Sequence, residues 1–351
     1  KIIMTSVLAA GDRFSLPALF RERVGAAAGD VAGDIAELEL PWPDEPFWSV
    51  GGVDEASGDE DTLIEALRGR EAIVTQLAPL SRRVFEACPD LRFIGVSRGG
   101  PTNVDLAAAT ERGIAVCNVP GRNGVATAEM TLGLLLAVLR RIPMTQRTLE
   151  DGRWEGGFYR HDRVGFEVSG ATIGLIGAGA VGGHVARILD AMGADVLVYD
   201  PFLPAGALEG VVELVDSIDE VFRRADIVSI HARLTPETTG LVSAERLALM
   251  RPGSYLVNAA RGGLVDYDAV TDAIVSGQLG GAAFDVFPSE PADFSHPLFE
   301  AARAGHNVVM TPHIAGASTQ TAIRAAEGVA LELGRFLRGE PLQHELTGAV
   351  R

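Results

Sequence analysis

Three glycines and an aspartate carry the most specific chemical signal in this sequence. Gly177, Gly179 and Gly182 form a Gly-x-Gly-x-x-Gly pattern, and Asp200 follows downstream. Between a strand and a helix, such glycines allow a tight turn, close approach of a pyrophosphate, and close helix–strand packing. The helix N-terminus then holds the diphosphate, and Asp200 accepts ribose hydroxyls and repels a 2′-phosphate, so the pattern predicts NAD rather than NADP. The residues expected to bind the cofactor here are Gly177, Gly179, Ala180, Val181 and Asp200.

A dinucleotide cofactor implies hydride transfer, which needs a group that anchors the substrate and a group that carries a proton. Three candidates follow successive apolar runs: Arg261, Glu290 and His313. Each alone has an ordinary alternative, respectively a surface arginine, a loop acid and a buried core histidine. Together, beyond successive predicted strands and behind a dinucleotide pattern, they predict a catalytic site.

The glycines need a strand before them and a helix and strand after them, and the sequence supplies all three. An apolar, β-branched run over 171–176 precedes the turn, an amphipathic segment over 185–192 follows it, and a second apolar run over 196–199 ends at Asp200. This is the pattern of a βαβ unit. Further runs that predict strands recur at 226–230, 255–258, 281–286 and 308–311.

The chain before the turn has an α/β alternation of its own. Strands are predicted at 1–4, 72–74, 91–96 and 113–116, and helices at 81–88, 104–111 and 125–141. Residues 40–60 are rich in Pro, Gly and acids and include Trp42, Phe47 and Trp48, so they predict a long loop. A Gly- and charge-rich arm over 149–169 leads into the turn, and a helix over 318–338 follows the last predicted strand.

We therefore expect an α/β protein with a Rossmann-type nucleotide-binding domain inserted into a flavodoxin-like α/β substrate domain, with a cleft between them. The NAD-binding domain is expected over 118–318 and the substrate-binding domain over 1–117 plus 319–351. The last helix would return the chain to the first domain.

Composition limits the function further. The formal net charge of −17 argues against nucleic-acid and anionic-membrane partners, because binding phosphates requires a basic face. No apolar run is long enough to span a membrane, no signal segment opens the chain, and the two cysteines lack metal-ligand spacing. We expect a cytoplasmic protein without a bound metal, and any anionic substrate must meet local positive charge.

Three segments of this sequence resemble the signatures of the D-2-hydroxyacid dehydrogenase family. They are Asn258–Asp266, Phe284–Pro291 and Thr311–Ser318. The resemblance covers nearly the whole chain and is specific for the family, but not for phosphoglycerate, glyoxylate/hydroxypyruvate or another hydroxy acid. It implies that Arg261 binds the substrate carboxylate, that His313 is the general acid/base, and that Glu290 orients His313 and favours its charged form.

The resemblance also implies a contact between Asp285 and the nicotinamide carboxamide, with a strand-end cap as the alternative role of Asp285. An acid at Glu290 favours a hydroxy acid over formate, since the related formate dehydrogenases have an amide at the matching position. The loop Ser97–Asp105 corresponds to the family's carboxylate-binding loop, where Gly99 and Gly100 fit. The implied substrate-binding residues are Arg98, Gly99, Gly100 and Arg261.

The sequence departs from the family pattern at Arg98, where many members have Gly, and at Arg233, where many have Pro. The Arg98 side chain either reads the substrate or packs its stem under the loop, and the role of Arg233 stays open. The apolar helix over 125–141 and the arm with Trp154 and Phe158 predict a homodimer, the alternative being a helix buried in its own domain. We expect an NAD-dependent oxidoreductase interconverting a D-2-hydroxy acid and its 2-oxo acid; the alternative is an NAD-sensing, non-enzymatic corepressor-like protein on this fold.

Overall fold

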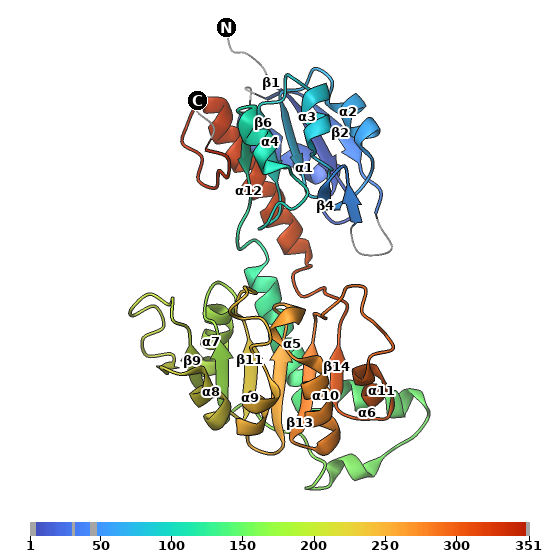
Figure 1. Cartoon of the computed structure of the whole chain (residues 1–351), viewed down its shortest axis with the longest axis vertical. Helices are drawn as coiled ribbons and strands as arrows, with labels where there is room; N and C mark the ends of the chain where they lie inside the picture. The colour runs from blue at the N-terminus through green and yellow to red at the C-terminus, as the bar shows by residue number, and fades with distance from the viewer. Residues whose placement is uncertain (1–4, 30–31, 43–47, 349–351) are drawn as a thin grey trace. The chain divides into compact units, whose positions relative to one another are not determined.

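The chain folds into two compact units in the computed structural model (Figure 1). The structure describes residues 5–29, 32–42 and 48–348. Unit 1 comprises Lys1–Arg122 and Ser318–Arg351, and unit 2 comprises Asn123–Ala317. No helix among the described residues is long and apolar enough to cross a membrane.

Unit 1 contains a parallel sheet of five strands in the order β2-β1-β5-β6-β7. The strands are β1 (Thr5–Gly11), β2 (Ala32–Glu39), β5 (Ala72–Thr75), β6 (Phe93–Val96) and β7 (Ala115–Cys117). Successive strands of the sheet, counted along the chain, are ordered 2-1-3-4-5, which is the flavodoxin-like order. The direction of winding reverses between β1 and β5, where ligands of such sheets bind.

Helices cover both faces of this sheet (Figure 1). They are α1 (Pro17–Ala28), α2 (Glu60–Leu67), α3 (Arg82–Ala87), α4 (Leu106–Glu111) and α12 (Thr319–Arg338). Alternate strand residues face opposite cores. Leu8 and Ile73 pack with α2, α3 and α4, whereas Val7 and Val74 pack with α1 and α12. The last helix of the chain is therefore part of the core of unit 1.

The expectation of a loop over residues 40–60 is wrong for part of that segment. β3 (Trp48–Val50) and β4 (Val53–Ala56) form an antiparallel hairpin, in which Val50 pairs with Val53. Gly51 and Gly52 both have positive φ, 60° and 83°, as a two-residue hairpin turn requires. Phe47, and the strand predicted at residues 1–4, lie outside the described residues, and β1 begins directly after them.

The C-terminal segment after α12 lies along the outer side of β7. Glu345 bridges Cys117 in antiparallel sense, and the Leu346 N–H donates to Val116 O at 2.8 Å. The Thr347 hydroxyl accepts from the Val116 N–H at 3.1 Å and donates to Ile114 O at 3.0 Å. This segment therefore covers the edge of the five-stranded sheet.

Unit 2 contains a parallel sheet of seven strands in the order β10-β9-β8-β11-β12-β13-β14. The strands are β8 (Thr172–Ile176), β9 (Asp195–Tyr199), β10 (Glu213–Leu214), β11 (Ile227–Ile230), β12 (Ser254–Asn258), β13 (Leu279–Phe284) and β14 (Val308–Met310). Counted along the chain the order is 3-2-1-4-5-6-7, the Rossmann order with one added strand. The α/β architecture predicted from the sequence, with a Rossmann-type domain inserted into a second α/β domain, is confirmed.

The helices of unit 2 also cover both faces of their sheet (Figure 1). They are α5 (Gly124–Leu139), α6 (Ile142–Glu150), α7 (Gly182–Ala191), α8 (Ile218–Arg224), α9 (Ala244–Leu249), α10 (Tyr267–Ser276) and α11 (Pro297–Arg303). α5 and α7 pack on one face, and α8, α9, α10 and α11 pack on the other. Leu134, Leu135 and Val138 of α5 are buried in the core of their own unit.

Candidate active site

The glycine-rich turn joins β8 to α7 at the point where the strand order of unit 2 reverses. Gly177 has φ of +92°, and a Cβ there would lie 2.9 Å from the carbonyl carbon of His231, at the end of β11. A Cβ on Gly182 would lie 2.2 Å from Gly177 O, whereas a Cβ on Gly179 would meet no described atom within 4 Å. Two of the glycines are thus required by close packing, and the third leaves open space at the helix N-terminus, where a pyrophosphate fits.

Asp200 lies directly after β9 and is fastened to the same turn. One carboxylate oxygen, Oδ2, accepts from the Ala178 N–H at 2.8 Å, and Oδ1 accepts from the Phe202 N–H at 2.9 Å. A carboxylate oxygen can accept more than one hydrogen bond, so both retain capacity for ribose hydroxyls. Ala180 is exposed and Val181 half-buried at the start of α7. The residues present therefore fit a dinucleotide.

Two of the three predicted catalytic residues are hydrogen-bonded to each other. His313 Nδ1 lies 2.5 Å from Glu290 Oε2, and Glu290 Oε1 accepts from the Phe287 N–H at 3.2 Å. The residues follow β14 and β13, which are neighbours in the sheet. Both side chains are partly exposed, His313 at 45% and Glu290 at 31%. The arrangement fixes the imidazole through Nδ1 and leaves Nε2 for a ligand.

Arg261 follows β12, the next strand in the same sheet. Its backbone oxygen accepts from the Asn258 side-chain amide at 2.9 Å, and its Nη1 donates to Ala260 O at 2.7 Å. Burial raises the pKa of Glu290, but the hydrogen bond and charge of His313, the Phe287 N–H and the charge of Arg261 outweigh it. The pKa of Glu290 is therefore held below its ordinary value, and the carboxylate stays ionised beside His313.

Asp285 organises the turn that carries His313. It is fully buried, and its Oδ1 accepts from the Thr311 hydroxyl at 2.5 Å and the Ile314 N–H at 2.9 Å. Its Oδ2 accepts from the Ala315 N–H at 2.8 Å. His313 has φ of 52°, in the left-handed region that residues other than glycine adopt at a cost. The buried carboxylate stabilises that backbone, and the contact of Asp285 with the nicotinamide stays a prediction.

The loop after β6 in unit 1 contains the other predicted substrate-binding residues. Arg98 pairs with the carboxylate of Glu55 on β4 and donates to Glu55 O at 3.2 Å, so its side chain lies along the hairpin. Gly99 and Gly100 are exposed, and within the described part of the chain their N–H groups donate to no protein acceptor. Asn118 holds the loop by donating from its amide to Gly99 O at 2.6 Å.

The structure thus brings Arg261, Glu290 and His313 together in unit 2, and places Arg98, Gly99 and Gly100 together in unit 1. Arg233 is exposed, and its backbone oxygen accepts from the Thr238 hydroxyl at 2.7 Å. Sequence reasoning missed Glu55 as the partner of Arg98, because no motif links the two positions.

Comparison with known proteins agrees with these geometries. Residues 132–315 match the family model described as D-isomer specific 2-hydroxyacid dehydrogenase, NAD binding domain. A D-3-phosphoglycerate dehydrogenase of Methanocaldococcus jannaschii is 38% identical over 295 residues, which are 83% of this chain and 54% of that protein. The chain therefore spans about half the length of that curated relative.

Two solved structures resemble nearly the whole chain. One, of a protein from Thermus thermophilus, has 31% identity and a TM-score of 0.75 and covers 97% of this chain and 99% of its own. The other is an NAD-dependent formate dehydrogenase from Staphylococcus aureus in complex with NAD, with 29% identity and a TM-score of 0.76. This match covers 98% of this chain and 100% of the dehydrogenase chain. These matches support NAD as the cofactor.

Proposed function

The chain belongs to the D-isomer-specific 2-hydroxyacid dehydrogenase family, and we propose that it is an NAD-dependent oxidoreductase that interconverts a D-2-hydroxy acid and its 2-oxo acid. One observation carries the proposal: His313 and Glu290 form a hydrogen-bonded pair beyond β14 and β13, and Arg261 lies beyond β12, the neighbour of β13, in the unit that contains the glycine-rich turn. This arrangement combines a proton carrier, an anion-binding group and a dinucleotide site.

Each side chain has a defined task in the reduction of the 2-oxo acid. The glycine-rich turn and Asp200 would hold NADH, which when bound would supply the hydride to C2 of the substrate. His313 donates a proton from Nε2 to the oxygen on C2, because Nδ1 is occupied by Glu290. The ionised Glu290 stabilises the protonated imidazole, and the guanidinium of Arg261 binds the substrate carboxylate through its planar fork. In the oxidation direction His313 accepts the proton.

Substrate binding by unit 1 is the second part of the proposal. The N–H groups of Gly99 and Gly100 suit a carboxylate, because they are exposed donors without protein acceptors among the described residues. Arg98 contributes positive charge to this loop, partly offset by Glu55. The acid at position 290 favours a hydroxy acid over formate, since formate oxidation releases no proton that needs a base. The corepressor-like alternative gains no support from relatives that are named as dehydrogenases.

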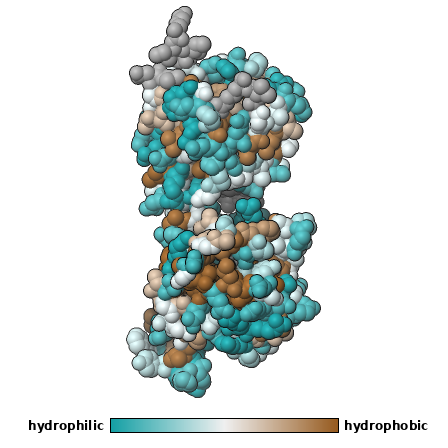
Figure 2. All heavy atoms as spheres, turned by 90° about the vertical axis from the view of Figure 1, so that its left-hand side faces the viewer, coloured by the Kyte–Doolittle hydropathy of each residue, from teal (hydrophilic) through white to brown (hydrophobic). Residues whose placement is uncertain are grey.

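A homodimer and a cytoplasmic location without nucleic-acid partners also belong to the proposal. Trp154 and Tyr159 of the arm are 88% and 92% exposed, so two large aromatic side chains of this segment are available to a second copy of the chain. On the face drawn in Figure 2, hydrophobic surface gathers on unit 2 more than on unit 1. Light scattering at micromolar protein should give twice the chain mass of 36.9 kDa, and a single-chain mass would contradict the dimer.

A panel of 2-oxo acids tests the activity. We expect purified protein to consume NADH with glyoxylate, hydroxypyruvate, pyruvate or 3-phosphohydroxypyruvate. For every product except the achiral glycolate, the D-hydroxy acid should reduce NAD and its L-enantiomer should not. Pairing each assay with His313→Ala separates catalysis by this chain from a contaminant. Absence of turnover with the whole panel in both directions would refute the proposed function.

A further inference from the structure

Three of the buried side-chain atoms that lack a hydrogen-bond partner in the described structure lie at one edge of the unit 1 sheet. Within the described part of the chain, Asp12 Oδ2, Ser97 Oγ and Arg122 Nη1 are buried and lack a partner. Asp12 directly follows β1, Ser97 directly follows β6, and Arg122 lies in the loop after β7. All three therefore lie beyond carboxyl ends of parallel strands, and Asp12 adjoins the β1–β5 switch point, where such sheets bind ligands.

Asp12 is held rigidly with one oxygen left over. Its Oδ1 accepts from the N–H groups of Phe14 and Ser15, both at 2.8 Å. The Ser15 hydroxyl donates in turn to Gln76 Oε1 at 2.5 Å, across the switch point. The side chain of Asp12 is fully buried, so Oδ2 has lost water without gaining a protein donor.

Arg122 is the complementary group. Its guanidinium lies over the Phe14 ring, 5.9 Å from the centroid, and its backbone oxygen accepts from Arg324 Nε at 3.0 Å. Burial and the charge of Arg98 lower the pKa of Arg122 to about 10, against the opposing effect of Asp12. Burial raises the pKa of Asp12, while its backbone hydrogen bonds and the charges of Arg122 and Arg98 oppose this.

Asp12 and Arg122 thus influence each other electrostatically without a hydrogen bond or ion pair between them in the described structure. A rigid acceptor and a buried donor remain unused at a ligand-binding edge. A hydroxyl group suits both, because it donates to a carboxylate and accepts from a guanidinium.

We infer that Asp12 and Arg122 form a subsite in unit 1 for a hydroxyl group on the substrate. The inference rests on the proposed function and narrows the substrate class to 2-oxo and 2-hydroxy acids that carry a further hydroxyl. An unsubstituted alkyl group at the same place leaves both buried groups unpaired, and a site built to hydrogen-bond a hydroxyl discriminates against substrates that lack it for this reason.

The test compares two substrates that differ by one hydroxyl, hydroxypyruvate and pyruvate, in the wild type, Asp12→Asn and Arg122→Gln. Asparagine keeps the acceptor for Phe14 and Ser15 but replaces Oδ2 by an amide that cannot accept. The wild type should prefer hydroxypyruvate in kcat/KM, and each substitution should lower that preference about 10- to 100-fold, mainly through KM for hydroxypyruvate.

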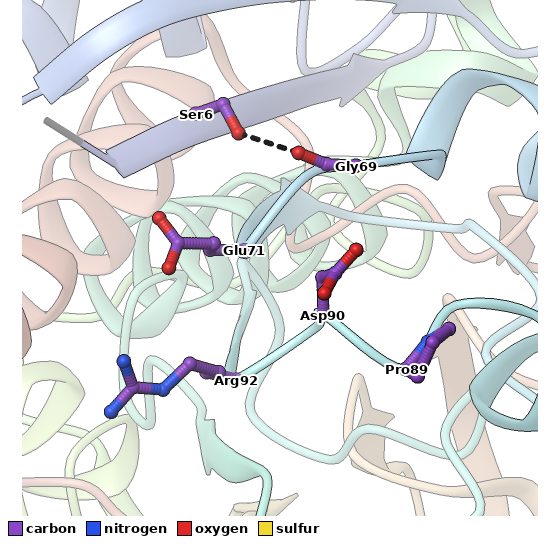
Figure 3. A pocket seen from close by; sticks show the side chains of 6 residues that line it. All are labelled: Ser6, Gly69, Glu71, Pro89, Asp90 and Arg92. Atoms are coloured by element: carbon purple, nitrogen blue, oxygen red, sulfur yellow. Dashed lines mark hydrogen bonds between the residues drawn. The ribbon is translucent and has the colours of Figure 1, made fainter.

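Arg92→Gln is the matched control. The Arg92 guanidinium also lies over an aromatic ring, 5.9 Å from the centroid of Phe336 in the same unit. It lines a depression with Ser6, Gly69 and Glu71 at the amino end of the sheet (Figure 3), so loss of an arginine there should leave the substrate preference unchanged.

Three outcomes would overturn the inference. A wild type that prefers pyruvate is one, and an unchanged preference in both variants is another. A fall of equal size on both substrates is the third, because it would assign the unpaired atoms to a trapped water. If Asp12→Asn does not fold, as judged by circular dichroism, the test rests on the preference of Arg122→Gln for hydroxypyruvate over pyruvate.

A wild type inactive on the whole panel of 2-oxo acids would count against the proposed function alone. The subsite is then read from thermal unfolding with NADH and D-glycerate or D-lactate. D-glycerate should raise Tm more than D-lactate in the wild type and not in Arg122→Gln, and equal shifts in the wild type would contradict the subsite.

Discussion

The polar side chains at the carboxyl edges of the two sheets differ in how fully they are hydrogen-bonded. In unit 2, Asp285 accepts three hydrogen bonds and Glu290 is bonded to His313. In unit 1, Asp12 Oδ2 and Arg122 Nη1 are buried without partners among the described residues. The side chains at the unit 2 edge are thus held in place before a substrate binds. Proton transfer requires this, because the reaction rate falls steeply when the acid or base is displaced. At the unit 1 edge, a donor and an acceptor remain unpaired and can bind a ligand.

The largest effect is expected from removing the proton carrier at the carboxyl edge of the unit 2 sheet. We predict that His313→Ala lowers kcat by roughly 10²–10⁴-fold, the usual contribution of a positioned general acid/base. Steady-state kinetics with the best 2-oxo acid provides the measurement, and NADH affinity by fluorescence titration should stay near the wild-type value. A kcat within a few-fold of the wild type would assign the proton step to another group.

Asp285→Asn tests whether that edge depends on the buried carboxylate. An amide cannot accept at both of its polar atoms, so at least one donor from Thr311, Ile314 or Ala315 loses its partner. We expect kcat to fall about 10- to 100-fold as the turn carrying His313 relaxes. A normal kcat with a large loss of NADH affinity would instead favour the nicotinamide contact as the main role of Asp285.

The cofactor side of the same edge is tested at Asp200. Removing its carboxylate removes the repulsion of a 2′-phosphate and the acceptor for ribose hydroxyls. Asp200→Ala should therefore narrow the NAD/NADP ratio of kcat/KM by about tenfold or more, which corresponds to one charged hydrogen bond. Equal efficiency of the wild-type protein with both cofactors would refute the assignment.

A subtler change separates the charge of Glu290 from its shape. In the reduction direction the protonated His313 is the active form, so the rate falls as pH rises. Because the pKa of Glu290 is held low, its carboxylate is ionised through this range and stabilises the imidazolium. Glu290→Gln should therefore move the fall in rate to lower pH. A superimposable pH–rate profile would leave Glu290 as a loop acid.

The smallest effect contrasts the two edges directly through stability. Thr311→Val removes a donor from the buried Asp285 and should cost about 1–3 kcal/mol, seen as a lower Tm in calorimetry. Ser97→Ala removes a buried hydroxyl that has no partner among the described residues, so its Tm should stay equal or rise. A large fall in the Tm of Ser97→Ala would show that the polar groups at the unit 1 edge are hydrogen-bonded as fully as those at the unit 2 edge.

Local patterns in the sequence predicted most of unit 2. The glycine-rich turn and its flanking strands are determined by residues that are close in the sequence, so they can be predicted without knowledge of the tertiary structure. The role of Asp285 was less visible, because its donors Thr311, Ile314 and Ala315 reach it only through the pairing of β13 with β14.

Unit 1 was harder to predict. β2 is a half-exposed edge strand with Asp34, Glu37 and Glu39, residues that strands disfavour. The hairpin turn at Gly51 and Gly52 lies in a Pro- and acid-rich segment that obscures it. Asp12 and Arg122 share no motif, because only the parallel sheet brings the ends of β1 and β7 to one edge.

The covering of β7 by the C-terminal segment has a consequence for synthesis on the ribosome. An uncovered outer strand offers its N–H and C=O groups to any other chain and allows intermolecular strand addition. Here the cover at Glu345, Leu346 and Thr347 follows every strand and helix described for the molecule. A nascent chain therefore completes its five-stranded sheet before it can protect the edge of that sheet. Until then the outer strand β7 is open to strand addition by a neighbouring chain.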